Sequence, residues 1–168
     1  MSHQILRAAT GITIAVAFLF CATPGTAQQT SADVTDQIRE GQRLIRAEFR
    51  QFLLKEMKLS RDEEQAFWPL YERYSAEMRV INDRYFVVVA EYMDLYNRGQ
   101  IDDAAANRLI DSYFNARLEV LKFRQSYVSK FRDVMSGVSV ARFYQLENKV
   151  QAEVDAALAV GIPLAGSR

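Results

Sequence analysis

Cysteine and histidine are almost absent from this sequence of 168 residues, which contains one of each. Cys21 and His3 both lie near the N-terminus, in a segment with the features of a cleaved leader. The chain that remains has no disulfide, no thiol nucleophile, no imidazole base and no ordinary zinc, haem or copper site. Di-iron bundles are excluded because they need histidine ligands. The methionines are scattered rather than clustered, so they do not suggest a metal site. From these absences together we expect no catalytic residue, no cofactor and no metal site.

Residues 1–27 are typical of a secretory signal peptide. Arg7 supplies positive charge, an apolar run covers residues 11–22, and small residues lead to a predicted cleavage site after Ala27. The alternative, an uncleaved membrane anchor, is disfavoured because spanning a bilayer takes roughly 18 to 20 apolar residues. Lipidation of Cys21 is disfavoured because the bulky Phe20 precedes it. We therefore expect an exported protein of the periplasm.

Neither sign of charge dominates the sequence, which has 21 acidic and 21 basic residues. Arg7 is the only charged residue within the predicted signal peptide, so the processed chain carries one more negative than positive charge. Recruitment of nucleic acid or anionic membrane through overall charge is therefore excluded. We also expect no stable membrane insertion after cleavage.

The sequence has only three prolines and seven glycines, and almost all of them lie outside the long periodic stretches. After a short polar linker at 28–31, apolar residues recur every three or four positions, which indicates helices. Four helices are predicted over about 32–58, 60–99, 102–134 and 139–160. We expect an all-α fold with one helical domain over 32–160 and a flexible tail at 161–168.

The ends of the predicted helices carry capping residues. Ser60 and Glu63 have the spacing of a capping box, in which each side chain accepts a hydrogen bond from the backbone of the other. Asp102 is a good N-cap for the third helix. Gly99 suits the left-handed conformation that ends the second helix.

The second and third predicted helices are joined by only a few residues around Gly99. They should form a long antiparallel hairpin, about 45 to 50 Å at 1.5 Å rise per residue. Two shorter helices give this hairpin little cover, so we expect an elongated homodimer. A compact monomeric four-helix bundle is the alternative.

A basic face is predicted on the first helix, where arginines follow one another at spacings of four, three and four residues. These are Arg39, Arg43, Arg46 and Arg50. At about 100° per residue they lie within an arc of roughly 60°, near Leu53 and Met57. Positive charge beside flexible apolar side chains suits the binding of unfolded chains or another protein partner. The alternative is a solvated face that pairs with carboxylates of a neighbouring helix.

Pro69 lies well inside the second predicted helix, where it removes the hydrogen bond to the carbonyl of Gln65 and favours a bend. A bend would either create a concave binding surface or let Phe67, Trp68 and Tyr71 wrap the core, and we favour the second interpretation.

Residues 142–149 form the densest mixture of aromatic and polar side chains. Glu147 and Asn148 have no acid or base beside them in sequence. We therefore expect them to make packing hydrogen bonds around a core formed by Phe143 and Leu146.

Leu59-Ser60-Arg61-Asp62-Glu63 resembles the Leu-Thr-x-x-Gln motif of the Spy and CpxP-like family of periplasmic proteins. Serine replaces threonine and glutamate replaces glutamine, and both replacements keep the capping chemistry. Val138-Ser139-Val140-Ala141-Arg142 stands where the family carries a second motif. Two further stretches are similar to signatures of related exported proteins, through Phe67, Trp68, Pro69, Phe143, Tyr144, Glu147 and Asn148.

This resemblance covers roughly residues 59–149. It implies an elongated helical fold, often a cradle-shaped dimer, with ATP-independent chaperone activity or a role in envelope stress signalling. The hypothesis that follows is a chaperone-like protein that binds non-native polypeptides on a basic and apolar helical surface. A regulatory partner of a membrane sensor domain is the alternative, and an enzyme is not expected.

Overall fold

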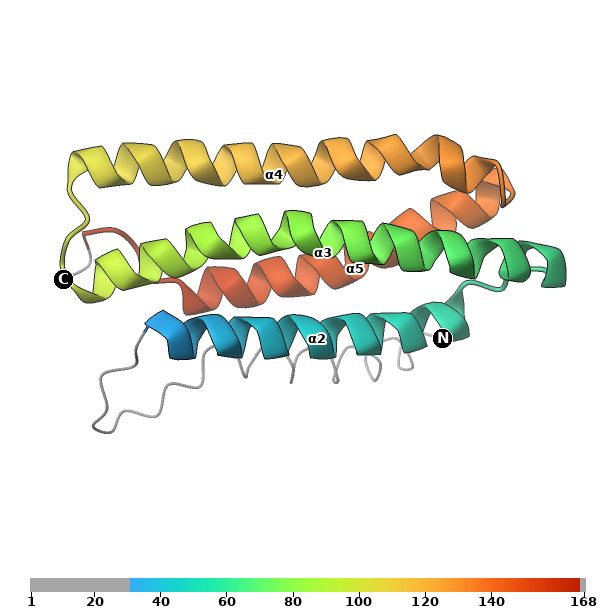
Figure 1. Ribbon diagram of the computed structural model, residues 1–168, viewed down its shortest axis with the longest axis horizontal. Helices are drawn as coiled ribbons and strands as arrows, with labels where there is room; N and C mark the ends of the chain where they lie inside the picture. The colour runs from blue at the N-terminus through green and yellow to red at the C-terminus, as the bar shows by residue number, and fades with distance from the viewer. Residues whose placement is uncertain (1–30, 167–168) are drawn as a thin grey trace. The chain divides into compact units, whose positions relative to one another are not determined.

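The computed structural model describes residues 31–166, and it describes side-chain surroundings from residue 40 onward apart from Gln42. Four helices make up this part of the chain: α2 (Ser31–Glu56), α3 (Arg61–Asn97), α4 (Asp103–Arg132) and α5 (Gly137–Gly161) (Figure 1). The predicted all-α class is confirmed. The predicted signal peptide, most of the linker and the last two residues of the tail lie outside the described residues. None of the helices described combines the length and the apolarity needed to cross a bilayer.

The chain divides into two compact units. One unit spans 59–141 and contains α3, α4 and the first residues of α5, and the other contains α2 and the remainder of α5.

The predicted caps of α3 and α4 are confirmed. Ser60 Oγ accepts from the backbone N–H of Glu63, at 3.3 Å, while the Glu63 carboxylate accepts from the backbone N–H of Ser60, at 3.0 Å. Asp102 Oδ1 accepts from the N–H of Ala105 at 2.8 Å. Gly99 follows α3 with a φ of 65°, which a glycine adopts without strain.

The helix ends differ from the prediction by up to two residues, and two of these differences have a clear local cause. Helix α2 stops at Glu56, because Lys58 takes a left-handed backbone conformation with a φ of 54°. Helix α5 begins at Gly137, because Ser136 is its N-cap, with Oγ accepting from the N–H of Ser139 at 3.2 Å.

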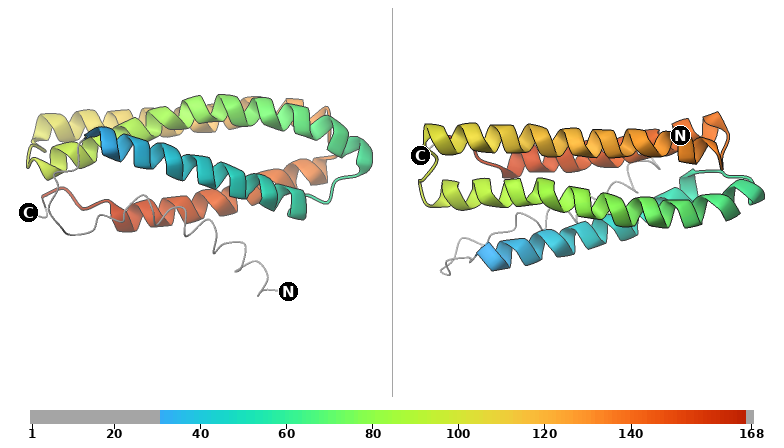
Figure 2. Two further views of the ribbon diagram at one scale, coloured as in Figure 1. Left: turned by 60° about the horizontal axis from the view of Figure 1, so that its bottom comes forward. Right: turned by 45° about the horizontal axis from the view of Figure 1, so that its top comes forward.

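Helices α3 and α4 pack side by side as the predicted long hairpin (Figures 1 and 2). The packing is antiparallel, because residues late in α3 meet residues early in α4. Arg84 forms an ion pair with Glu119 at 2.7 Å, and Glu91 pairs with Arg108 nearer the connecting turn. Helix α3 continues through Pro69.

A cluster of aromatic rings fills the part of the hairpin far from the turn. The Tyr74 ring lies 5.1 to 5.5 Å from the rings of Phe123, Tyr127 and Phe131. Phe67 packs on Phe131 with ring centroids 5.9 Å apart, and both are fully buried. Aromatic pairs at these distances add roughly 0.5–1.5 kcal/mol each beyond the area they bury. The interpretation of these aromatic stretches as core is confirmed.

In the second unit, Arg142 Nη1 donates a hydrogen bond to the carbonyl of Glu56, at 3.0 Å. This bond connects the start of the α5 segment to the end of α2. Its buried apolar residues recur along α5 at spacings of three and four, on one face of the helix. They are Phe143, Leu146, Val150, Val154 and Leu158. The predicted core positions Phe143 and Leu146 are confirmed.

Candidate interaction surfaces

The predicted basic face of α2 is partly neutralised by its own helix. Arg43 makes a bidentate pair with Glu40, at 2.8 Å from Nε and 2.6 Å from Nη2. The hydrogen bond from Arg43 is the largest cause of a lowered pKa of Glu40. The side chains of both residues are exposed. Arg46 and Arg50 also have interaction partners, while the side chain of Arg39 lies outside the described residues. The alternative predicted pairing with carboxylates of a neighbouring helix, whereas the carboxylate that binds Arg43 belongs to the same helix.

The apolar part of that predicted surface is not at the surface. Leu53 has 0% of its side chain exposed and Met57 has 3%. Leu53 lies in the last turn of α2 and Met57 directly follows the helix, and both belong to the buried core. The expectation that Leu53 and Met57 offer exposed apolar contact was therefore wrong, while partner binding by the arginines stays a prediction.

Glu63, in the family-like motif, joins the N-termini of two helices. Its Oε2 accepts from the N–H of Ser60 at 3.0 Å and from Ser60 Oγ at 3.1 Å. Its Oε1 accepts from the N–H of Ser136 at 2.8 Å and from Ser139 Oγ at 3.1 Å. One carboxylate thus caps α3 and also satisfies donors at the start of α5, where negative charge suits the helix dipole. The resemblance-derived motif positions Leu59 to Glu63 and Ser139 meet at this point.

These hydrogen bonds lower the pKa of Glu63 to about 2, with the Ser136 N–H as the largest cause and the Ser60 N–H next. The carboxylate is therefore ionised throughout the neutral range. Such a group suits a structural role, in which it holds the starts of α3 and α5 together. It does not suit proton transfer, which is most efficient when the pKa of the group lies near the working pH.

The remaining motif residues are mainly structural. Phe67 and Phe143 are fully buried, and Trp68 and Tyr144 are partly buried with ring contacts to these neighbours at 5.1 Å. Glu147 is half-buried and Asn148 exposed, and each has an interaction partner. Pro69 is exposed on α3.

An apolar stripe on α4 is a surface that the sequence analysis missed. The side chains of Ile110, Phe114, Leu118 and Leu121 are 53%, 65%, 46% and 60% exposed. At about 100° per residue, Phe114 lies roughly 140° around the helix from the buried Leu109. We call these four residues the α4 outer face.

A signal for this face is present in the sequence. Apolar residues occur in adjacent pairs along α4: Leu109 with Ile110, Tyr113 with Phe114, and Val120 with Leu121. A helix with one buried stripe needs only one member of each pair. The second member indicates a second apolar face.

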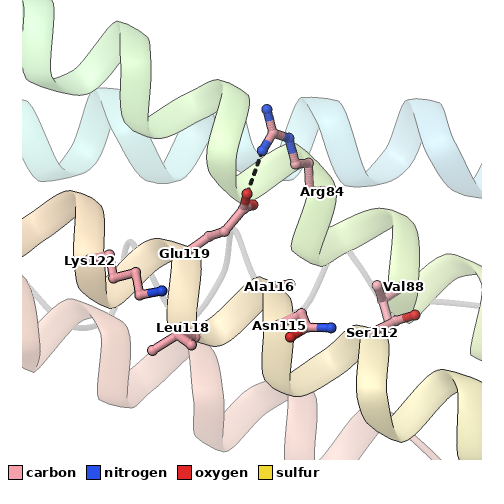
Figure 3. Close-up of a pocket in the computed structure, with 8 residues that line it drawn as sticks. All are labelled: Arg84, Val88, Ser112, Asn115, Ala116, Leu118, Glu119 and Lys122. Carbon is pink, nitrogen blue, oxygen red and sulfur yellow. Dashed lines mark hydrogen bonds and ion pairs between the residues drawn. The ribbon is translucent and has the colours of Figure 1, made fainter.

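A hollow of about 480 Å³ adjoins the α4 outer face at Leu118 (Figure 3). Helix α3 contributes Arg84 and Val88 to its lining. Helix α4 contributes Ser112, Asn115, Ala116, Leu118, Glu119 and Lys122. The ion pair of Arg84 with Glu119 spans the two helices at its edge. The hollow is therefore a mixed polar and apolar recess beside the stripe.

Among the residues described, no group of three or more His, Cys, Asp or Glu side chains is placed to hold a metal ion. Comparison with models of known protein families, with curated proteins and with solved structures finds no match to this chain. The resemblance to the Spy and CpxP-like family therefore rests on the motif residues alone.

Proposed function

We propose that this is a chaperone-like protein of the periplasm that binds non-native polypeptides without a nucleotide. The observation that carries the proposal is the α4 outer face, an apolar stripe exposed on a helix whose opposite side is already packed. Contiguous exposed apolar surface of this kind typically marks an interaction site.

The α4 outer face suits a partner of varied sequence. Its four residues are aliphatic or aromatic, and they offer area and shape rather than a fixed set of hydrogen bonds. The neighbouring hollow, with Ser112, Asn115 and Lys122 in its lining, can accept a protruding side chain or a backbone carbonyl. Apolar contact of this kind is non-directional, so it tolerates different client sequences.

Two further features support the proposal without being required by it. The motif at residues 59–63 resembles that of periplasmic chaperones, and residues 1–27 have the composition of a signal peptide. The arginines of α2 add local positive charge that attracts acidic segments of a client at long range. We also propose that the protein forms a homodimer.

The test is suppression of aggregation of a chemically unfolded client by the processed protein, at near-equal molar ratios. Phe114→Ser with Leu121→Ser should reduce the suppression at least several-fold, because it removes the most exposed apolar groups of the stripe. Both positions are more than half exposed, so the variant should keep its helical circular dichroism signal.

Val87→Ser is the matched control, because Val87 is 65% exposed, as Phe114 is, but lies on α3. Suppression that is unchanged in the Phe114 and Leu121 variant would contradict the proposal. Selective, saturable binding to one folded membrane-sensor domain, without suppression of aggregation, would instead support the regulatory alternative.

A further inference from the structure

The charges that line the hollow between α3 and α4 do not cancel. Two of its lining residues are cationic, Arg84 and Lys122, and one is anionic, Glu119. Arg84 is held by Glu119, with Nη1 and Oε1 2.7 Å apart. Lys122 is exposed, and within the described part of the chain it forms no ion pair. The hollow therefore keeps one uncompensated positive charge.

Two neutral polar side chains near Lys122 are also available to a ligand (Figure 3). Ser112 is half-buried and Asn115 is exposed, and neither side chain is hydrogen-bonded to another residue that the structure describes. Together with Glu119 and Lys122 they follow one another at spacings of three, four and three residues, which places all four in one row along α4. Hydroxyl, amide and ammonium groups all donate hydrogen bonds. The row therefore offers donors to a ligand that accepts them.

The hollow is continuous with the α4 outer face. Leu118 belongs to both, and Val88 and Ala116 add apolar surface to the lining. A ligand that fills the hollow therefore contacts both hydrogen-bond donors and apolar carbons. A carboxylate suits the donors, because it is negatively charged and both of its oxygens accept hydrogen bonds. An acidic side chain between apolar neighbours in one polypeptide meets both requirements.

We infer that the hollow binds the carboxylate of an aspartate or glutamate of the client, while neighbouring apolar residues of the same client lie on the α4 outer face. The inference rests on the proposed function and names the class of client, an apolar segment that carries an acidic residue. Lys122 supplies the opposite charge. Asn115 and Ser112 supply further hydrogen bonds along the row.

The position of Asp111 decides which end of the row receives the acidic residue. Asp111 is exposed and precedes the row, and it lies about 16 Å from Lys122 along the helix at 1.5 Å rise per residue. This separation exceeds the screening length of about 8–10 Å at physiological salt, so Asp111 does not cancel the charge of Lys122. The acidic residue of a client therefore binds at the Lys122 end of the row.

The resulting selectivity is modest in size. Lys122 is exposed, and an exposed ion pair changes affinity only about two- to fivefold. The hollow therefore ranks clients by their charge, whereas apolar contact on the α4 outer face retains them.

Three synthetic peptides test the inference. They share one apolar segment and differ only in a central glutamate, glutamine or lysine. Both ends are blocked and the fluorophore is uncharged, so the central residue decides the charge. Fluorescence anisotropy measures the dissociation constant of each peptide with the processed protein. The glutamate peptide should bind about two- to fivefold more tightly than the glutamine peptide, and the lysine peptide should bind most weakly.

Variants of the hollow should change this order. Lys122→Glu should reverse it, so that the lysine peptide binds most tightly. Asn115→Asp exchanges an amide for a carboxylate of the same shape and should remove the preference for glutamate. Glu119→Gln releases Arg84 from its ion pair and should increase the preference about two- to fivefold. General damage to the fold would not produce such an increase.

Lys149→Glu is the matched control, because Lys149 is an exposed lysine on α5 and the change in net charge equals that of Lys122→Glu. This control should keep the wild-type order of the peptides. Equal binding of the glutamate and glutamine peptides to the wild type, or an unchanged order in the Lys122 variant, would overturn the inference.

The same measurements separate the inference from the proposed function. Tight binding of all three peptides without a preference for glutamate overturns the inference and still supports the proposed function. Binding of none of them refutes both. A preference for glutamate that persists at wild-type affinity in the Phe114→Ser and Leu121→Ser variant supports the carboxylate site, but it contradicts the α4 outer face as the client surface.

Discussion

The carboxylate of Glu63 accepts a hydrogen bond from the backbone N–H of Ser136, 73 positions further along the chain, at 2.8 Å. The same side chain completes the capping box of α3 with its other oxygen. The first residues of α3 and of α5 are thus fixed to each other by one side chain, and this contact does not follow from the local sequence pattern around either residue.

Glu63→Gln should destabilise the protein by about 1–2 kcal/mol. Both oxygens of Glu63 accept from backbone N–H groups, whereas a glutamine has one oxygen and an amide group that can only donate. The glutamine oxygen can therefore accept from the N–H of Ser60 or from that of Ser136. The other N–H then faces the glutamine amide group, which is itself a donor. Urea unfolding measures the loss, and Asp62→Asn serves as the control because Asp62 is exposed at the same helix end.

Acid should weaken the hydrogen bonds of the Glu63 carboxylate over a defined range of pH. The pKa of Glu63 is lowered from 4.5 to about 2 in the folded protein, so the carboxylate contributes its full stabilisation above pH 4.5. That contribution is lost as the pH falls from 4.5 toward 2. Glu63→Gln should therefore show a shallower decline in unfolding free energy over this range than the wild type. Parallel curves for the two proteins would contradict the assignment.

Tyr127→Phe should destabilise the hairpin by about 0.5–1.5 kcal/mol. The Tyr127 hydroxyl donates to Glu77 at 2.9 Å, and burial followed by this hydrogen bond raises the pKa of Tyr127 to about 12. Because the folded pKa is raised, the tyrosine stabilises the fold below pH 10 and this contribution declines as the pH rises toward 12. Thermal unfolding measures the difference, and Tyr113→Phe is a control on the same helix.

Arg43→Glu with Arg46→Glu should slow capture of an acidic client, with little effect on the final level of suppression. Long-range attraction mainly governs the rate of association, whereas apolar contact on the α4 outer face governs retention. Stopped-flow fluorescence at low and high salt measures the rate, and the difference between wild type and variant should shrink at high salt. A variant that loses suppression completely at both salt concentrations would move the client site to α2.

The sequence was sufficient for those features that depend on neighbouring residues. The periodicity of α3 and α4, the capping box of Ser60 with Glu63 and the glycine turn at Gly99 all follow from local rules, and all are confirmed. Periodicity also identified the buried side of α4, through Leu109 and Tyr127.

Other features depend on tertiary packing. A helical pattern shows that Leu53 and Met57 follow the basic stripe of α2, but it does not show whether other elements cover them. On α4 the adjacent apolar pairs signal a second face, yet only the packing of α3 shows that the Phe114 side is left exposed.

The most direct test of the central claim is photocrosslinking from single positions on the hairpin to an unfolded client. A photoreactive side chain at position 114 reports contact with the α4 outer face, and the same group at position 87 reports an equally exposed site on α3. Client adducts formed mainly from position 114 are expected. Equal yields from both positions, or no adducts from position 114, would show that the α4 outer face is not where clients bind.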